Sequence, residues 1–361
     1  MKQFRVTILL FLCSYPLQAQ EPAMGGFDLR ATAAAMGVVS SYLDAPPRIG
    51  AVGDGGLRVV VYPTLKLGPH WSFTGAYQLM SRPYYYESFT TQLHGFRGDL
   101  LQGTVNYARV SDRGSLSVRV GKLSTAFGSF GLRYDSADNP VVGLPIQYGY
   151  YYAMVTNLGL YGAQLDVTRG KWDGRLQLVN ASPLNPRSLT SKDQYGNWAG
   201  GAGYTLLQGL RIGFSAYYGP YLDRHHRFFF RGEANPNTLP ARAIGVDGQW
   251  ANGHWSLYGE WQTFHVPYKA IPDYDAHAGY LEFKRVLNPR FYVAGRAGYR
   301  NGSGGNIRQT YEGAVGFRAT TNQLFKIGYQ RDQLSSGPRP HENTCVFEAI
   351  TTIHPLSLGW K

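Results

Sequence analysis

The sequence is poor in cysteine, in charge and in long apolar runs. It has two cysteines, and Cys13 lies in the short apolar run that follows Lys2 and Arg5. This start, residues 1–20, is predicted to be a secretory signal peptide, because its apolar run is too short to span a membrane. Cleavage would leave Cys345 as the remaining cysteine, so no intrachain disulfide is expected.

Residues 21–361 contain no apolar stretch of roughly 20 residues, which excludes a membrane-spanning helix. Charged residues make up only 16% of the chain, whereas glycine occurs 45 times and tyrosine 27 times. A secreted β-propeller or lectin would share part of this composition. Abundant aromatic residues and glycine with little charge are also typical of strands whose outward side chains face lipid. We expect residues 21–361 to form a single domain.

Period-two alternation is the strongest pattern in this domain. In residues 311–318 the odd positions are Tyr, Gly, Val and Phe, and the even positions are Glu, Ala, Gly and Arg. A period of two places each set on one face of a strand, so one face suits hydrocarbon and the other suits water. The same alternation recurs at 71–79, 116–121, 211–218, 255–262, 291–300 and 325–330.

Short and long connections alternate between these segments. Seven short turns rich in Gly, Asn, Asp and Pro separate eight longer polar connections, which gives 16 strands. The pattern predicts an all-β fold, a transmembrane antiparallel β-barrel with short periplasmic turns and long extracellular loops. We place the first strand at about 27–40 and the last at about 343–353, before Pro355. The longer connections are predicted at 41–55, 82–97, 123–156, 182–196, 220–240, 267–275, 301–308 and 334–342.

The third long connection, about 123–156 and here called loop 3, is the longest. At its start, Gly121-Lys122-Leu123-Ser124-Thr125-Ala126-Phe127-Gly128 is similar to the glycine-lysine to phenylalanine-glycine motif of phosphate-selective (polyphosphate) porins, which usually have proline where this chain has Ala126. The resemblance implies a 16-stranded passive channel, a homotrimer, with loop 3 folded into the lumen. It also implies that basic residues, here Arg119 and Lys122, line the constriction.

The sequence therefore predicts a porin in the outer membrane of a Gram-negative bacterium, through which small hydrophilic solutes diffuse passively. The formal net charge of +12 suits anionic solutes and the head groups of outer-membrane lipid and lipopolysaccharide, while export excludes nucleic acid. Basic residues outnumber acids at inward positions, which favours anions such as phosphate. The residues predicted to line the pore or its constriction are Arg119, Lys122, Arg133, Asp135, Asp138, Arg58, Arg175, Arg296, Arg318 and Lys326.

Two alternatives remain open, a non-channel barrel that acts as an adhesin or structural protein and an outer-membrane hydrolase. The chain has no Gly-x-Ser-x-Gly, His-Glu-x-x-His or Walker motif, and His277 has no evident serine partner. His225 and His226 are adjacent and would point opposite ways in an extended chain, which suits a metal poorly. We therefore expect no catalytic residue, no metal and no cofactor.

Overall fold

The computed structural model describes residues 25–41, 53–82, 95–129, 135–148, 159–182, 188–190, 196–221, 239–268, 272–335 and 340–360. No helix in these ranges is long and apolar enough to cross a membrane. The strands of the described chain are β1 (Gly25–Ser40), β2 (Gly53–Lys66), β3 (Trp71–Arg82), β4 (Gly95–Ser111), β5 (Gly114–Leu123), β6 (Leu160–Arg169), β7 (Trp172–Val179), β8 (Asn197–Leu207), β9 (Leu210–Pro220), β10 (Pro240–Asn252), β11 (Trp255–Val266), β12 (Tyr274–Val286), β13 (Phe291–Gly302), β14 (Asn306–Arg318), β15 (Gln323–Leu334) and β16 (His341–Trp360).

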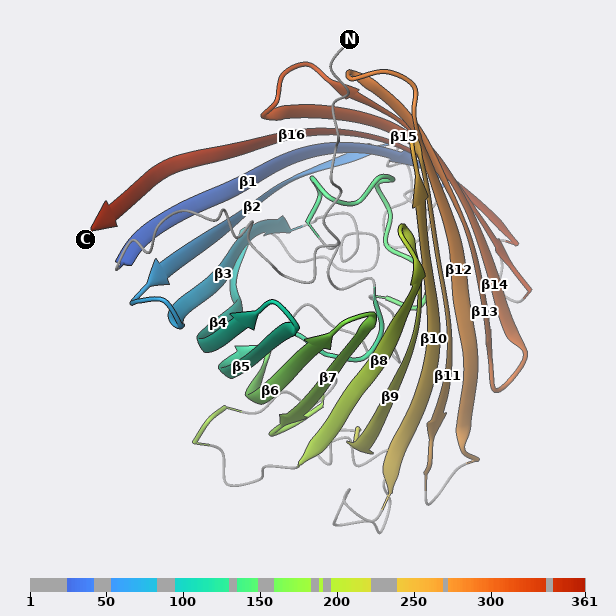
Figure 1. Ribbon diagram of the computed structural model, residues 1–361. Helices are drawn as coiled ribbons and strands as arrows, with labels where there is room; N and C mark the ends of the chain where they lie inside the picture. Colours follow the sequence, from blue (N-terminus) through green and yellow to red (C-terminus); the bar gives the residue numbers. More distant parts are fainter. Residues whose placement is uncertain are drawn as a thin grey trace.

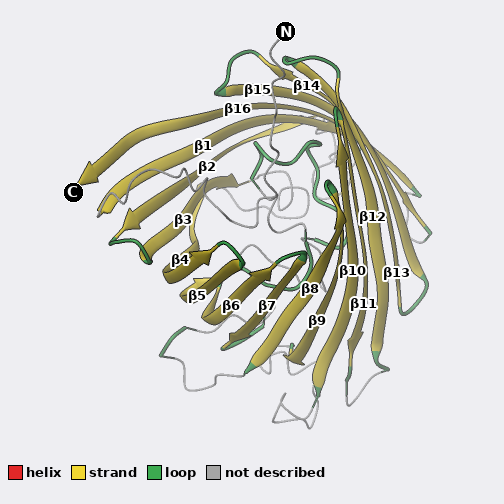
Figure 2. Cartoon of the chain, viewed as in Figure 1, coloured by secondary structure: helices red, strands yellow, loops and turns green. Residues whose placement is uncertain are grey.

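These strands form one closed antiparallel barrel, which confirms the predicted fold class. Each strand pairs with its neighbours in the chain, and β1 pairs with β16 to close the ring. Figures 1 and 2 show the strands as a ring around an interior that contains loop segments. Closure pairs the backbone N–H and C=O groups of both edge strands, which is what a sheet in hydrocarbon requires.

The two faces of the wall differ in chemistry, as the alternation in the sequence predicts. In β11, Trp261 points outward and is 43% exposed, whereas its neighbours Glu260 and Gln262 point inward and are buried. Valine, leucine and aromatic side chains dominate the outward positions around the barrel, and buried Arg, Lys, Glu, Gln and Thr side chains occupy inward ones. The barrel is apolar outside and polar inside.

The last strand is longer than predicted. β16 runs from His341 to Trp360, so the predicted end at about 353 is wrong. Its register against β1 shifts between Leu29 and Ala31, where two residues of β16, one of them Pro355, face one residue of β1. Proline has no N–H to donate to the ladder, and a bulge leaves the extra residue unpaired while the strand continues.

One predicted long connection is also wrong. The segment 301–308 is a tight turn, because β13 ends at Gly302 and β14 begins at Asn306. Gly304 and Gly305 have φ angles of 93° and 76°, a region that glycine enters without steric cost. The exposed residues described in this segment are the three turn residues, Ser303, Gly304 and Gly305, and they do not form a long loop.

Candidate pore constriction

Loop 3 begins by packing on the inner wall. Phe127 is 1% exposed, and its ring meets Tyr217 of β9 and Phe264 of β11 edge-on, with centroids 6.4 and 6.3 Å away. The rings lie in one buried cluster with small inward residues of the neighbouring strands, which leave room for them: Ala199, Ala241, Ala243, Ala276 and Ala278. In Figure 1 the described parts of this loop, coloured blue-green, lie inside the ring of strands.

Glu260 of β11 holds two distant points of the loop. The Ser129 N–H donates to Glu260 Oε1 at 3.0 Å, and the Tyr148 hydroxyl donates to Glu260 Oε2 at 2.7 Å. Gly128, with a φ of 82°, passes so close that a Cβ there would lie 2.5 Å from the Tyr148 hydroxyl oxygen. Ser129 and Tyr148, which are 19 positions apart in the chain, are therefore fastened to the same carboxylate.

Arg296 of β13 fixes the middle of the loop. Its guanidinium donates to the carbonyl of Gly143 at 2.7 Å and to Asn139 Oδ1 at 2.9 Å. Glu282 and Glu312 form ion pairs with it at 2.5 and 3.3 Å, and only 1% of the Arg296 side chain is exposed. Both acids compensate a charge that the loop has sealed from water.

Lys326 of β15 binds the loop backbone directly. Its ammonium donates to the carbonyls of Ser136, Asn139 and Val141 at 2.6, 2.9 and 3.3 Å. Glu348 of β16 lies 2.9 Å from the same nitrogen, and both side chains are almost fully buried. The three N–H groups serve the three carbonyls, so Glu348 contributes mainly its charge.

Two loop aspartates differ in environment. Asp135 is buried, accepts a hydrogen bond from the Tyr62 hydroxyl of β2, and lies 3.7 Å from Arg30 of β1. Asp138, by contrast, has an exposed surface. The protein around the Asp138 carboxylate displaces water from it, and this desolvation raises the pKa of Asp138. The negative charge of the nearby Asp135 raises the same pKa further.

Charged side chains on β5 and β6 and at the short-turn end of β9 have no described contact with loop 3. Arg119 of β5 pairs with Asp166 of β6 at 2.7 Å, and about a fifth of each side chain is exposed. Arg211 of β9 pairs with Asp173 and Asp247, both at 2.7 Å. This wall is charged but largely internally neutralised.

The structure separates the predicted pore residues into groups. Arg119 and Arg175 lie on the uncovered inner wall, and Arg318 lies at the short-turn end of β14 on an inward position. Arg296 and Lys326 are covered by the loop that they bind. The predicted roles of all these residues in conduction remain predictions.

Three further predicted residues stand apart. Arg58 of β2 is 3% exposed and donates from Nε to Gln78 Oε1 at 2.8 Å. Lys122 pairs with Tyr161 in the register of β5 and β6, and the alternation places it on the opposite face of β5 from Arg119. Arg133, like the His225–His226 pair, lies outside the described residues.

The sequence did not reveal which residues hold the loop. Alternation marks Glu260 and Tyr62 as inward, but it does not pair them with Ser129 and Asp135. Phe127 and Gly128 belong to the motif that resembles phosphate-selective porins, and this motif was the available signal. In the structure, Phe127 packs against Tyr217 and Phe264, and Gly128 lets the backbone pass close to the Tyr148 hydroxyl.

No family model matches the chain, and no curated protein matches its sequence. Solved structures do match. The in-vitro folded trimer form of OmpT, an outer membrane protein of Vibrio cholerae, has a TM-score of 0.60 and 9% identity over 91% of this chain and 100% of that chain. An anion-selective porin from Comamonas acidovorans has a TM-score of 0.56 and 11% identity over 92% of this chain and 100% of that one.

The outer membrane channel DcaP of Acinetobacter baumannii gives a TM-score of 0.59 and 7% identity over 92% of this chain and 98% of that chain. The chain is an outer-membrane β-barrel. Its closed sheet, apolar outside and polar inside, is the architecture that spans the outer membrane of Gram-negative bacteria. At these identities the likeness establishes the fold, and the specific resemblance to phosphate-selective porins remains a prediction.

Proposed function

We propose that the protein is a porin, a passive channel through which small hydrophilic solutes cross the outer membrane without catalysis, metal or cofactor. One observation carries this proposal. The described part of loop 3 is fastened to the inner wall by Glu260, Arg296 and Lys326, while the wall around Arg119 and Asp166 stays partly exposed. Such a lumen is narrowed on one side and remains polar on the other.

The constriction in this proposal lies between loop 3 and the wall of β5 to β9. Asp138 brings exposed acidic charge on the loop, whereas Asp135 is buried against Tyr62 and Arg30. Arg175 and the Arg119–Asp166 pair carry charge on the facing wall. Opposed charges across a narrow aqueous gap create a transverse field, which orders water and slows apolar solutes. Loop 3 as a whole, 123–156, is the proposed constriction element.

A preference for anions is the finer part of the proposal. Arg175 and Arg318 occupy inward positions and form no ion pair within 4 Å among the described residues, although Asp166 is directly opposite Arg175 in the register. Unpaired basic groups along a pore favour anion passage. The anion-selective porin among the structural neighbours supports this selectivity, and the trimer form of OmpT supports a homotrimer.

Liposome swelling tests the porin function. Proteoliposomes that contain the folded barrel should swell in isotonic arabinose and more slowly in a larger sugar such as raffinose. The same protein, heat-denatured before reconstitution, is the matched control. A folded barrel that admits neither sugar would be a plugged, non-channel barrel, and the proposal would then be wrong.

A further inference from the structure

A recess of about 530 Å³ lies on the wall over β10 to β14. The outward residues that form it occupy two neighbouring rows of the strand register. Three outward positions that are not buried carry no side chain larger than a methyl group: Gly248 of β10, Gly259 of β11 and Ala297 of β13. The surrounding outward side chains are large, so these three positions form a floor below the apolar surface of the barrel, while on β12 the Trp261 indole covers Gly279.

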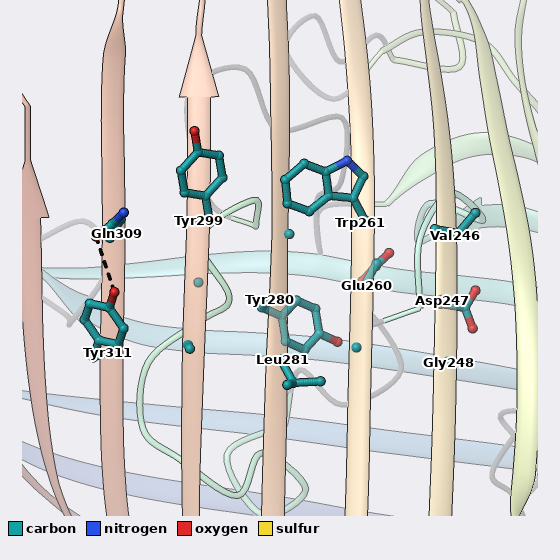
Figure 3. A pocket seen from close by; sticks show the side chains of 14 residues that line it. Val246, Asp247, Gly248, Glu260, Trp261, Tyr280, Leu281, Tyr299, Gln309 and Tyr311 are labelled. Atoms are coloured by element: carbon teal, nitrogen blue, oxygen red, sulfur yellow. Dashed lines mark hydrogen bonds between the residues drawn. The ribbon is translucent and has the colours of Figure 1, made fainter.

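Two aromatic rings form a wall of this recess. Trp261 and Tyr299 flank Gly279 in one register row, and their rings are nearly parallel, at 11°, with centroids 6.0 Å apart. A Cβ at Gly279 would lie 2.4 Å from Trp261 Cε3, so the indole lies directly over the glycine. Figure 3 shows the two rings on either side of β12, with Leu281 lower in the view.

The dimensions suit a single hydrocarbon chain. Crossing the floor from β10 to β13 covers three inter-strand spacings, or about 14 Å. One leaflet of the hydrocarbon core is about 15 Å thick. A flexible acyl chain can follow a narrow floor of this length, whereas the flat wall of a second barrel would bridge it and leave a void.

A cation lies beyond one end of the recess. Arg331 of β15 is directly opposite Tyr311, which lines the recess on β14, and Arg331 is exposed on the outward face. The described outward residues around it, Gln309, Tyr329 and Asn343, include no acid. Arg331 lies three residues before the end of β15 at Leu334, on the side of the predicted extracellular loops. An arginine there extends toward lipid phosphates at the membrane surface.

We propose that this recess, here called the outer groove, binds one acyl chain of a phosphorylated outer-leaflet lipid, lipid A, whose phosphate contacts Arg331. The apolar floor and rings contact the acyl chain, and the guanidinium donates charge-assisted hydrogen bonds to the phosphate. The proposal depends on the location of the barrel in the outer membrane and not on conduction.

Native mass spectrometry of the delipidated barrel, titrated with purified lipid A, tests the outer groove. Ala297→Leu fills an exposed position of the floor and should weaken the binding of the first lipid A about tenfold, since it displaces buried methylenes. Arg331→Gln should weaken it about fivefold, as expected for one basic residue at a membrane surface. The matched controls are Ala163→Leu, at an exposed outward position of β6, and Arg285→Gln, an outward arginine at the short-turn end.

The expected result is one tightly held lipid A in the unmodified barrel and in both controls, and weaker binding by these factors in the two groove variants. Equal binding by all five proteins would show lipid that surrounds the barrel without a site, and would overturn the proposal. A change of oligomeric state in Ala297→Leu, with lipid A binding unchanged, would assign this face to a second copy and would also overturn it.

Discussion

Lys326 offers the sharpest perturbation of the loop attachment. Its ammonium binds three loop carbonyls and neutralises Glu348, all in a buried setting. Lys326→Met keeps the apolar stem and removes all of these interactions. Removal of one partner of a buried ion pair costs about 3–5 kcal/mol. Because about 1.4 kcal/mol corresponds to a factor of ten, the ratio of released to attached loop should rise by roughly two to three and a half orders of magnitude.

Single-channel recording in planar bilayers, together with hydrogen exchange of the Ser136–Val141 amides, measures this release. Lys326→Met should give larger and noisier unitary currents and faster exchange in the loop. Glu348→Gln is the control, because it leaves the ammonium and its three carbonyl contacts in place. Unchanged currents and unchanged exchange in a folded Lys326→Met barrel would refute the conclusion that this side chain holds the loop.

Three further predictions concern the same lumen. Gly128→Ala should lower the stability of the loop attachment by about 1–2 kcal/mol for the positive φ alone, with more from the close approach to Tyr148, and faster exchange at Ser129 would report it. The pKa of Asp138 is raised, so as the pH falls its carboxylate should begin to lose its negative charge above the usual aspartate pKa near 3.9. The anion-to-cation permeability ratio should rise as this charge is lost. Asp138→Asn should abolish the rise. Arg119→Glu changes the wall by two charge units, worth about 1 kcal/mol at roughly 8 Å in water, and should lower that ratio several-fold in reversal-potential measurements; an unchanged ratio would exclude a role for Arg119 in selectivity.

The barrel was predictable because its determinants are local. Alternation at period two and the spacing of Gly, Asn and Pro turns depend on residues near one another in the chain, and they predicted the strand number and the fold class. The errors arose where local composition was ambiguous. Pro355 suggested that the last strand ends before it, but a bulge at this position lets β16 continue. The polar segment 301–308 suggested a long loop, but it contains a tight turn between two long strands.

The loop attachment was not predictable for the opposite reason. Lys326 and Ser136 are 190 positions apart, and Glu260 and Ser129 are 131 positions apart. Nothing in the sequence pairs such residues, because each strand presents several polar side chains to the lumen. Inward charge could be inferred, but whether an inward lysine faces water or a loop carbonyl depends on the path of loop 3 across the barrel.

The central claim is that water and solute pass along the uncovered inner wall, and thiol modification during single-channel recording tests it most directly. Ser117 lies on the inward face of β5 near Asp166, and Val120 on the same strand points outward and is 54% exposed. With Cys345 replaced by serine, Ser117→Cys should lose unitary current in discrete steps when a charged methanethiosulfonate is added, whereas Val120→Cys should not respond. A folded barrel without unitary current would contradict the claim that solutes pass along this wall. So would a Ser117→Cys barrel whose current is unchanged after modification.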